Sequence, residues 1–213
     1  MKKIILLTVA AAFFASACTT NPYTGDRQVS RTAIGAVGGA AAGAVAGQAI
    51  RGDTRGTLVG AAAGAALGGA AGGYMDNQNA RLRQELQGTG VQIAREGDNI
   101  HLIMPGNITF DSGVSAIQSS FFPVLNSVAR VLNEFNRTHI HITGHTDSTG
   151  SLDANNRLSV QRAQSVADYL VAQRVARSRM VIRGAGPSMP IGDNATAFGR
   201  EQNRRVEIVL SPM

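Results

Sequence analysis

Apolar residues two positions apart predict strands in the second half of the chain. Val91 and Ile93 show this spacing, and so do Ile100 and Leu102. A period of two is typical of a strand that buries one face. The turn EGD at 96–98 predicts that these two strands form a β-hairpin. Further strands are predicted at 139–143, 180–183 and 205–210.

Two other segments repeat their apolar residues at helical spacing. The apolar positions are Leu125, Val128, Ala129 and Leu132 in the first segment, and Val160, Ala163, Val166, Ala167 and Leu170 in the second, which runs from about 159 to 173. Ser119 or Ser120 fits the N-cap of the first helix, and Pro123 fits only its first turn.

These elements follow one another in the order β-β-α-β-α-β-β over residues 90–213. Strands that alternate with helices indicate an α/β (α+β) domain of two layers. We expect a mixed sheet of four or five strands, covered by two helices. A long connection near 186–200 precedes the last strand.

Residues 32–75 have a different pattern, in which glycine recurs every four residues. The glycines are Gly35, Gly39, Gly43 and Gly47 in the run 32–50, and Gly60, Gly64, Gly68 and Gly72 in the run 56–75. This spacing places glycine along one helix face, where a second helix can approach closely. We therefore predict a glycine-zipper helical hairpin that turns at 51–55, followed by a connecting helix at 76–89.

A flexible linker is the alternative for the glycine-rich region, because each glycine costs about 1 kcal/mol relative to alanine inside a helix. Strict spacing and scarce serine argue against such a linker. Each run would be about 28–30 Å long as a helix, close to one hydrocarbon thickness. Embedding in a membrane and homo-oligomerisation through the zipper both remain open.

The N-terminal residues have the pattern of a secretory signal peptide. Lys2 and Lys3 precede an apolar stretch at 4–14 and the small residues ASA at 15–17. This order is that of a signal peptide, which we assign to 1–17, and the apolar stretch is too short to span a bilayer. Cys18 follows at once and is the only cysteine, so no intramolecular disulfide can form.

Charge argues against nucleic acid as a partner. The formal net charge is +6, but residues 76–213 carry 14 arginines against 12 acidic residues. No block of like charge stands out, whereas nucleic-acid-binding domains gather basic residues on one patch. We also find no cofactor motif and expect no cofactor.

The residues around Cys18 resemble the lipobox of bacterial lipoproteins, with Ser16 and Ala17 fitting well and Ala15 fitting less well. The resemblance implies that Cys18 becomes the mature N-terminus and carries acyl chains, with 18–31 as the lipidated linker. Each buried methylene contributes about 0.8 kcal/mol to membrane attachment, so several chains anchor firmly. Thr19 after the cysteine implies sorting to the outer membrane, with the C-terminal domain in the periplasm.

Four motifs resemble those of OmpA-like peptidoglycan-binding domains. They are NITFD at 107–111, GHTDSTG at 144–150, N-x-x-L-S-x-x-R-A at 155–163 and NRRVE at 203–207. The resemblance covers roughly 90–211, and it departs at Ala185 and Pro187, on the rim of the expected site. The zipper and its ending at 74–76 resemble YiaD-type glycine-zipper lipoproteins.

The family's ligand is the diaminopimelate of the peptidoglycan stem peptide, which presents an ammonium and a carboxylate. The resemblance implies that Asp147 binds the ammonium and that Arg162, one turn into its helix, binds the carboxylate. The other expected ligand-binding residues are Asp111, Ser112, Thr146, Asn155, Leu158, Ser159 and Arg204. Of the arginines at 204 and 205, one should brace a carboxylate and the other should be solvated. The chain would then tether the outer membrane to peptidoglycan without catalysis.

Other interpretations stay open at this point. Asp147 and Arg162 could form an internal salt bridge without any ligand. A peptidoglycan hydrolase could use Ser148 or Ser159 with His145 and Asp147, although no nucleophile-elbow motif is present. His139, His141 and His145 could bind a metal, but no cysteine or carboxylate cluster completes a ligand set, so we expect none. The zipper could also perturb membranes, with the domain as its tether.

Overall fold

The computed structural model describes residues 18–20, 27–29, 40–42, 44–46, 49, 54–111 and 113–213. The chain divides into two compact units, Met1–Asp76 and Asn77–Met213. The expected signal peptide at 1–17 lies outside the described residues, as does most of the first glycine run.

The N-terminal unit contains a short antiparallel pair of strands, β1 (Cys18–Thr20) and β2 (Arg27–Val29), in which Cys18 lies opposite Val29. Helix α3 begins at Thr54 and ends at Glu85. Within the ranges given above, no helix is both long enough and apolar enough to cross a membrane.

Helix α3 differs from the predicted pair of helices at this point of the chain. The second glycine run and the first part of the predicted connecting helix form one continuous helix. No proline lies between residues 54 and 85, and the stretch after residue 76 contains Arg, Gln, Leu, Ala and Glu, which favour helix. The helix is followed by a turn that contains Gly88 with φ of 76°, a conformation typical of a helix C-terminus.

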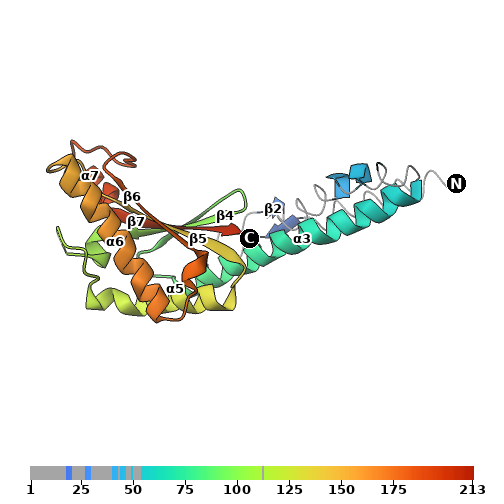
Figure 1. Cartoon of the computed structure of the whole chain (residues 1–213), viewed down its shortest axis with the longest axis horizontal. Helices are drawn as coiled ribbons and strands as arrows, with labels where there is room; N and C mark the ends of the chain where they lie inside the picture. The colour runs from blue at the N-terminus through green and yellow to red at the C-terminus, as the bar shows by residue number, and fades with distance from the viewer. Residues whose placement is uncertain are drawn as a thin grey trace. The chain divides into compact units, whose positions relative to one another are not determined.

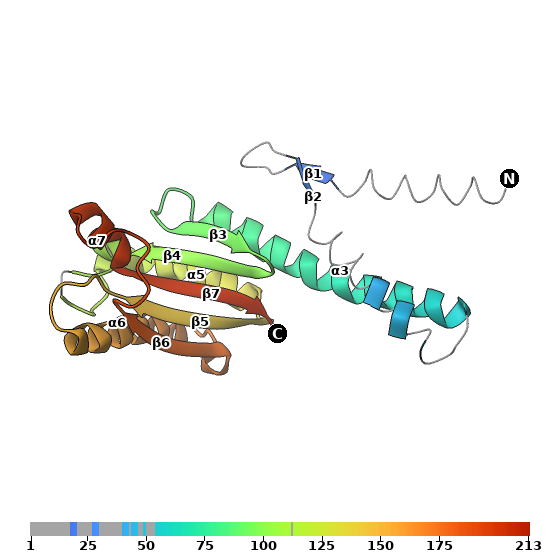
Figure 2. The same ribbon diagram turned by 90° about the horizontal axis from the view of Figure 1, so that it is seen from above.

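The C-terminal unit is built on a five-stranded mixed sheet with strand order β3-β4-β7-β5-β6, seen face-on in Figure 2. Its strands are β3 (Gln92–Glu96), β4 (Asn99–Pro105), β5 (Thr138–His145), β6 (Met180–Gly186) and β7 (Arg205–Pro212). Strands β5 and β6 are parallel, and the other neighbours are antiparallel. The predicted hairpin at 91–103 is confirmed as β3 and β4.

Helices α5 (Phe122–Glu134) and α6 (Leu152–Ala172) cover one face of this sheet (Figures 1 and 2). The predicted order β-β-α-β-α-β-β is therefore confirmed. Short elements are added to it: α4 (Gly106–Thr109), η1 (Ser119–Phe121), η2 (Arg177–Arg179) and α7 (Ala197–Asn203). Helix α7 lies in the connection expected near 186–200.

The starts of the two covering helices correct the predictions. Pro123 lies in the first turn of α5 as expected, but the residue at the cap is Phe121, without a side-chain hydrogen bond, because Ser119 belongs to η1. Helix α6 begins at Leu152 rather than near 159. The hydroxyl of Ser151 accepts a hydrogen bond from the backbone N–H of Ala154 and caps the helix there.

The core lies between the sheet and the two helices. Its largest fully buried side chains include Leu102, Leu125, Ile142, Leu170 and Ile208. Helix α6 approaches the sheet very closely at Gly144 of β5, where an added Cβ would lie 2.0 Å from the carbonyl oxygen of Ser159. Because no other residue fits there, this glycine holds the first half of α6 against the end of β5. The contact therefore fixes the position of α6 relative to the loop that follows β5.

Candidate functional site

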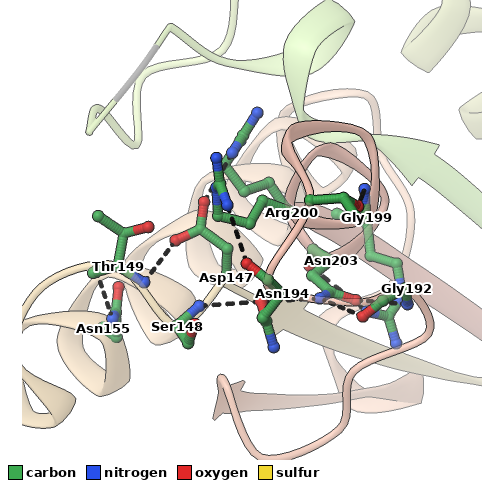
Figure 3. Close-up of polar contacts among 12 residues, drawn as sticks. Asp147, Ser148, Thr149, Asn155, Gly192, Asn194, Gly199, Arg200 and Asn203 are labelled. Atoms are coloured by element: carbon green, nitrogen blue, oxygen red, sulfur yellow. Dashed lines mark hydrogen bonds and ion pairs between the residues drawn. The ribbon is translucent and has the colours of Figure 1, made fainter.

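Asp147 lies in the loop that follows β5, and only 8% of its surface is exposed. Its Oδ1 accepts a hydrogen bond of 2.8 Å from the backbone N–H of Thr149 (Figure 3), and its Oδ2 lies 2.6 Å from Nη1 of Arg204. Burial alone would raise the pKa of this carboxyl group. The hydrogen bonds from Arg204 and Thr149 outweigh burial and hold the pKa below its usual value, so Asp147 is ionised at neutral pH.

Arg162 is more deeply buried, with 3% of its surface exposed. Its Nε donates to the carbonyl oxygen of Val114 at 3.0 Å, and its Nη2 donates to that of Asp111 at 3.3 Å. The guanidinium also lies 5.0 Å from the centroid of the Phe110 ring. Because α6 begins at Leu152, Arg162 lies about three turns into the helix rather than one.

The charges of Asp147, Arg162 and Arg204 act on one another and form one cluster. Burial lowers the pKa of Arg162, the positive charge of Arg204 lowers it further, and the carboxylate of Asp147 raises it. In the described part of the chain, the ion pair of Asp147 is with Arg204, and none joins it to Arg162. The alternative of an internal salt bridge was therefore wrong about the partner, although Asp147 does have one. The expectation that one arginine braces a carboxylate fits Arg204.

Three further predicted residues shape this cluster from α6. Asn155 is buried, and its Nδ2 donates to the carbonyl oxygen of Thr149 at 2.9 Å, which holds the loop after β5 (Figure 3). Leu158 is half-buried. Ser159 is fully buried, donates to the carbonyl oxygen of Asn156, and accepts from the backbone N–H of Gly186 at 3.0 Å. Its hydroxyl therefore joins α6 to β6 and is not directed to a ligand.

The remaining predicted residues lie at the edges of the cluster. Thr146 is buried, and its backbone N–H donates to the carbonyl oxygen of Gly186. Asp111 holds Arg162 through its backbone oxygen, while its exposed carboxylate accepts a hydrogen bond from Gln118. Ser112 lies outside the described residues.

Two asparagines of the connection before β7 also support the site, and the sequence did not single out Asn194. The amide of Asn203 binds the backbone of Ile191 and Gly192 and the side chain of Asn194. Asn194 Oδ1 in turn accepts from the backbone N–H of Ser148, next to Asp147 (Figure 3). Asn203 belongs to the motif at 203–207, but nothing in the local sequence marks Asn194.

His145 lies beside a second buried ion pair. Arg205 is 3% exposed and its Nε lies 2.7 Å from Glu207 Oε1, so the expectation of one solvated arginine was wrong. His145 Nε2 lies 3.9 Å from Glu207 Oε2. Burial and the charge of Arg205 lower the pKa of His145 to about 4, although Glu207 opposes this. His145 is therefore neutral at physiological pH.

Neither the hydrolase nor the metal interpretation gains support from this geometry. The hydroxyl of Ser159 is engaged with backbone groups, as described above, rather than with His145. Among the residues that the structure describes, no group of three His, Cys, Asp or Glu side chains is arranged to hold a metal ion.

Comparison with known proteins gives two family matches and full-length similarity to one protein. Residues 109–204 match the OmpA family, and residues 1–76 match the YMGG-like Gly-zipper family. The chain is 50% identical to "Probable lipoprotein YiaD" of Escherichia coli strain K12, with all of both chains covered.

Two other similarities cover only part of this chain. The "Peptidoglycan-binding protein ArfA" of Mycobacterium tuberculosis is 42% identical over 112 residues, which are 53% of this chain and 34% of ArfA. The solved structure of the cell wall anchor of the T6SS from Pseudomonas aeruginosa superposes with a TM-score of 0.57 at 30% identity. That match covers 62% of this chain and 98% of the anchor.

Proposed function

This chain belongs to the OmpA family, within the lipoproteins related to YiaD, and we propose that it tethers the outer membrane to peptidoglycan by non-covalent binding. The ligand is the diaminopimelate residue of the stem peptide. The observation that carries the proposal is a cluster of one carboxylate and two guanidinium groups, formed by the buried Asp147 and Arg162 and the partly exposed Arg204.

A zwitterionic side chain needs an acid and a base at a fixed separation, and the cluster offers both. Asp147 is buried and ionised, so its carboxylate binds the ligand ammonium. Arg162 donates to the ligand carboxylate through Nη1, since its Nε and Nη2 already donate to backbone oxygens. Charge-assisted hydrogen bonds of this kind are the strong ones in proteins.

The surrounding residues hold these groups in place and line the site. Asn155 fixes the loop that carries Asp147, and the backbone of Asp111 forms one wall. Leu158 and Thr146 contribute to the lining beside the cluster. Ser159 acts indirectly, by holding α6 against β6.

The membrane end of the tether is Cys18, acylated after removal of residues 1–17. The similarity to a lipoprotein over the whole chain supports this assignment. The attachment of the C-terminal domain to peptidoglycan is non-covalent. Some lipoproteins join peptidoglycan through a lysine amine, but the lysines here are Lys2 and Lys3, which leave with the signal peptide. The relatives are named as a binding protein and a lipoprotein rather than as enzymes, which agrees with binding without turnover.

Sedimentation with sacculi tests the proposal. The purified full chain in detergent should sediment with peptidoglycan that contains diaminopimelate, and free diaminopimelate should compete. Asp147→Asn should abolish sedimentation. Arg157→Gln is the matched control, since Arg157 forms an exposed ion pair with Asp153 on α6, apart from the cluster. A wild-type chain that stays in the supernatant, or an Asp147→Asn variant that sediments normally, would contradict the proposal.

A further inference from the structure

Arg204 occupies the position at which the proposed site would receive a ligand ammonium. Its Nη1 lies 2.6 Å from Asp147 Oδ2, while Thr149 donates to Oδ1. An ammonium that binds Asp147 would place a second cation on a buried carboxylate. Like charges at such distances repel strongly where water is largely excluded. The ammonium and Arg204 therefore compete for Asp147.

The two arginines of the cluster differ in their freedom to move. Arg162 is 3% exposed and is held by two backbone oxygens and the ring of Phe110. The side chain of Arg204 is 36% exposed, and Asp147 is the partner of its guanidinium in the described part of the chain. When a ligand enters, Arg204 is the group that can swing away, and Arg162 stays in place.

An Arg204 that leaves Asp147 needs another anion. The cluster holds two guanidinium groups against one carboxylate, and Arg204 already disfavours the charge of Arg162. The carboxylate of Asp111 does not fill this need, because it faces Gln118 at the rim. A ligand with one ammonium and two carboxylates would balance the cluster, with one carboxylate on each arginine.

We propose that ligand binding exchanges partners: the ligand ammonium replaces Arg204 on Asp147, and Arg204 then binds a second carboxylate, which diaminopimelate offers when it is free or is the last residue of the stem peptide. This inference rests on the proposed function and assigns Arg204 as the residue that selects dicarboxylate ligands. A ligand with only one carboxylate has to displace Arg204 without giving it a new partner. Such a ligand binds weakly to the wild-type protein.

Diaminopimelate and lysine form a matched pair for the test, because they differ only by the second carboxylate. Both are titrated against the full chain in detergent by calorimetry. The wild type should prefer diaminopimelate by roughly tenfold or more, the value of one charge-assisted bond. In Arg204→Gln, Asp147 has no arginine partner that lysine must displace, so lysine should bind roughly threefold to tenfold more tightly than to the wild type. Diaminopimelate should lose its contact with the arginine at position 204. The preference should therefore largely disappear.

Two further variants separate the possible results. Arg204→Lys keeps a cation that can pair with either carboxylate and should retain much of the preference, whereas Arg157→Gln should retain all of it. An unchanged preference in folded Arg204→Gln, or lysine binding that does not tighten, would overturn the exchange. If the wild type bound neither ligand, the proposed function itself would fail. Diaminopimelate binding that depends on Asp147 but not on Arg204 would refute only the exchange.

Discussion

Substituting the two residues of the proposed clamp, Asp147 and Arg162, should weaken binding to a similar extent. Asp147→Asn keeps the shape of the side chain but removes the charge that attracts the ligand ammonium. Arg162→Ala removes the group that binds a ligand carboxylate. A charge-assisted hydrogen bond contributes about 1.5–3 kcal/mol, so each variant should bind a diaminopimelate-containing peptide roughly 10- to 150-fold more weakly. The measurement is a calorimetric titration of each folded variant.

The same two variants should differ in stability. Arg162 is buried and holds the backbone at Asp111 and Val114 through two hydrogen bonds. Its removal leaves these carbonyl groups without their partner and should lower the free energy of unfolding by about 2–4 kcal/mol. Asp147→Asn keeps an oxygen that can still accept from Arg204 or Thr149 and should cost about 1 kcal/mol. Circular dichroism during urea denaturation measures both values.

The double variant tests whether the two residues hold one ligand residue. Losses at neighbouring sites that share a partner do not add, so the double variant should lose less than the sum of the single losses. Wild-type affinity in both single variants would refute the clamp and leave the cluster as a purely internal ion-pair network. Strictly additive losses would place the two residues in separate sites.

The remaining predictions concern the anchor, the wall contact and pH. Cys18→Ser should give an unprocessed or periplasmic protein that still binds peptidoglycan; a normally processed variant that stays in the outer membrane after a high-salt wash would argue against lipidation. Boiling in detergent should release the protein from sacculi, and retention would indicate a covalent bond. Because the pKa of His145 is lowered to about 4, the unfolded chain takes up a proton near pH 6.5 while the folded chain does not. The free energy of unfolding should therefore decrease by about 2 kcal/mol from about pH 7.5 to about pH 5. In His145→Gln this contribution to the decrease should be absent. Urea denaturation at both pH values measures the difference.

Apolar spacing was sufficient to predict the sheet and its covering helices, but it placed one helix start wrongly. The first turns of α6 are mostly exposed, and the buried residue there is the polar Asn155. The buried apolar residues therefore begin only at Ala163, although the helix begins at Leu152, and Val160, which was predicted to belong to the apolar stripe, is exposed. The cap formed by Ser151 was the signal that could have located the start.

The sequence named residues that the structure brings into one cluster, but it did not predict how they pair. The motif resemblance identified Asp147, Arg162 and Arg204, yet Arg204 lies 57 positions from its partner along the chain. That contact depends on how β7 pairs with β5, which local sequence does not encode. The support from Asn194 was missed for the same reason, since it acts on Ser148 across the loops.

The most direct test of the central claim compares two kinds of peptidoglycan in one pull-down. Sacculi whose stem peptides contain diaminopimelate and sacculi whose stem peptides contain lysine are incubated with the full chain at equal amounts, and the bound fraction is measured. We predict strong retention on the diaminopimelate type and little on the lysine type, because only the former carries a carboxylate next to the ammonium. Equal retention on both, or preference for the lysine type, would contradict recognition of the diaminopimelate residue.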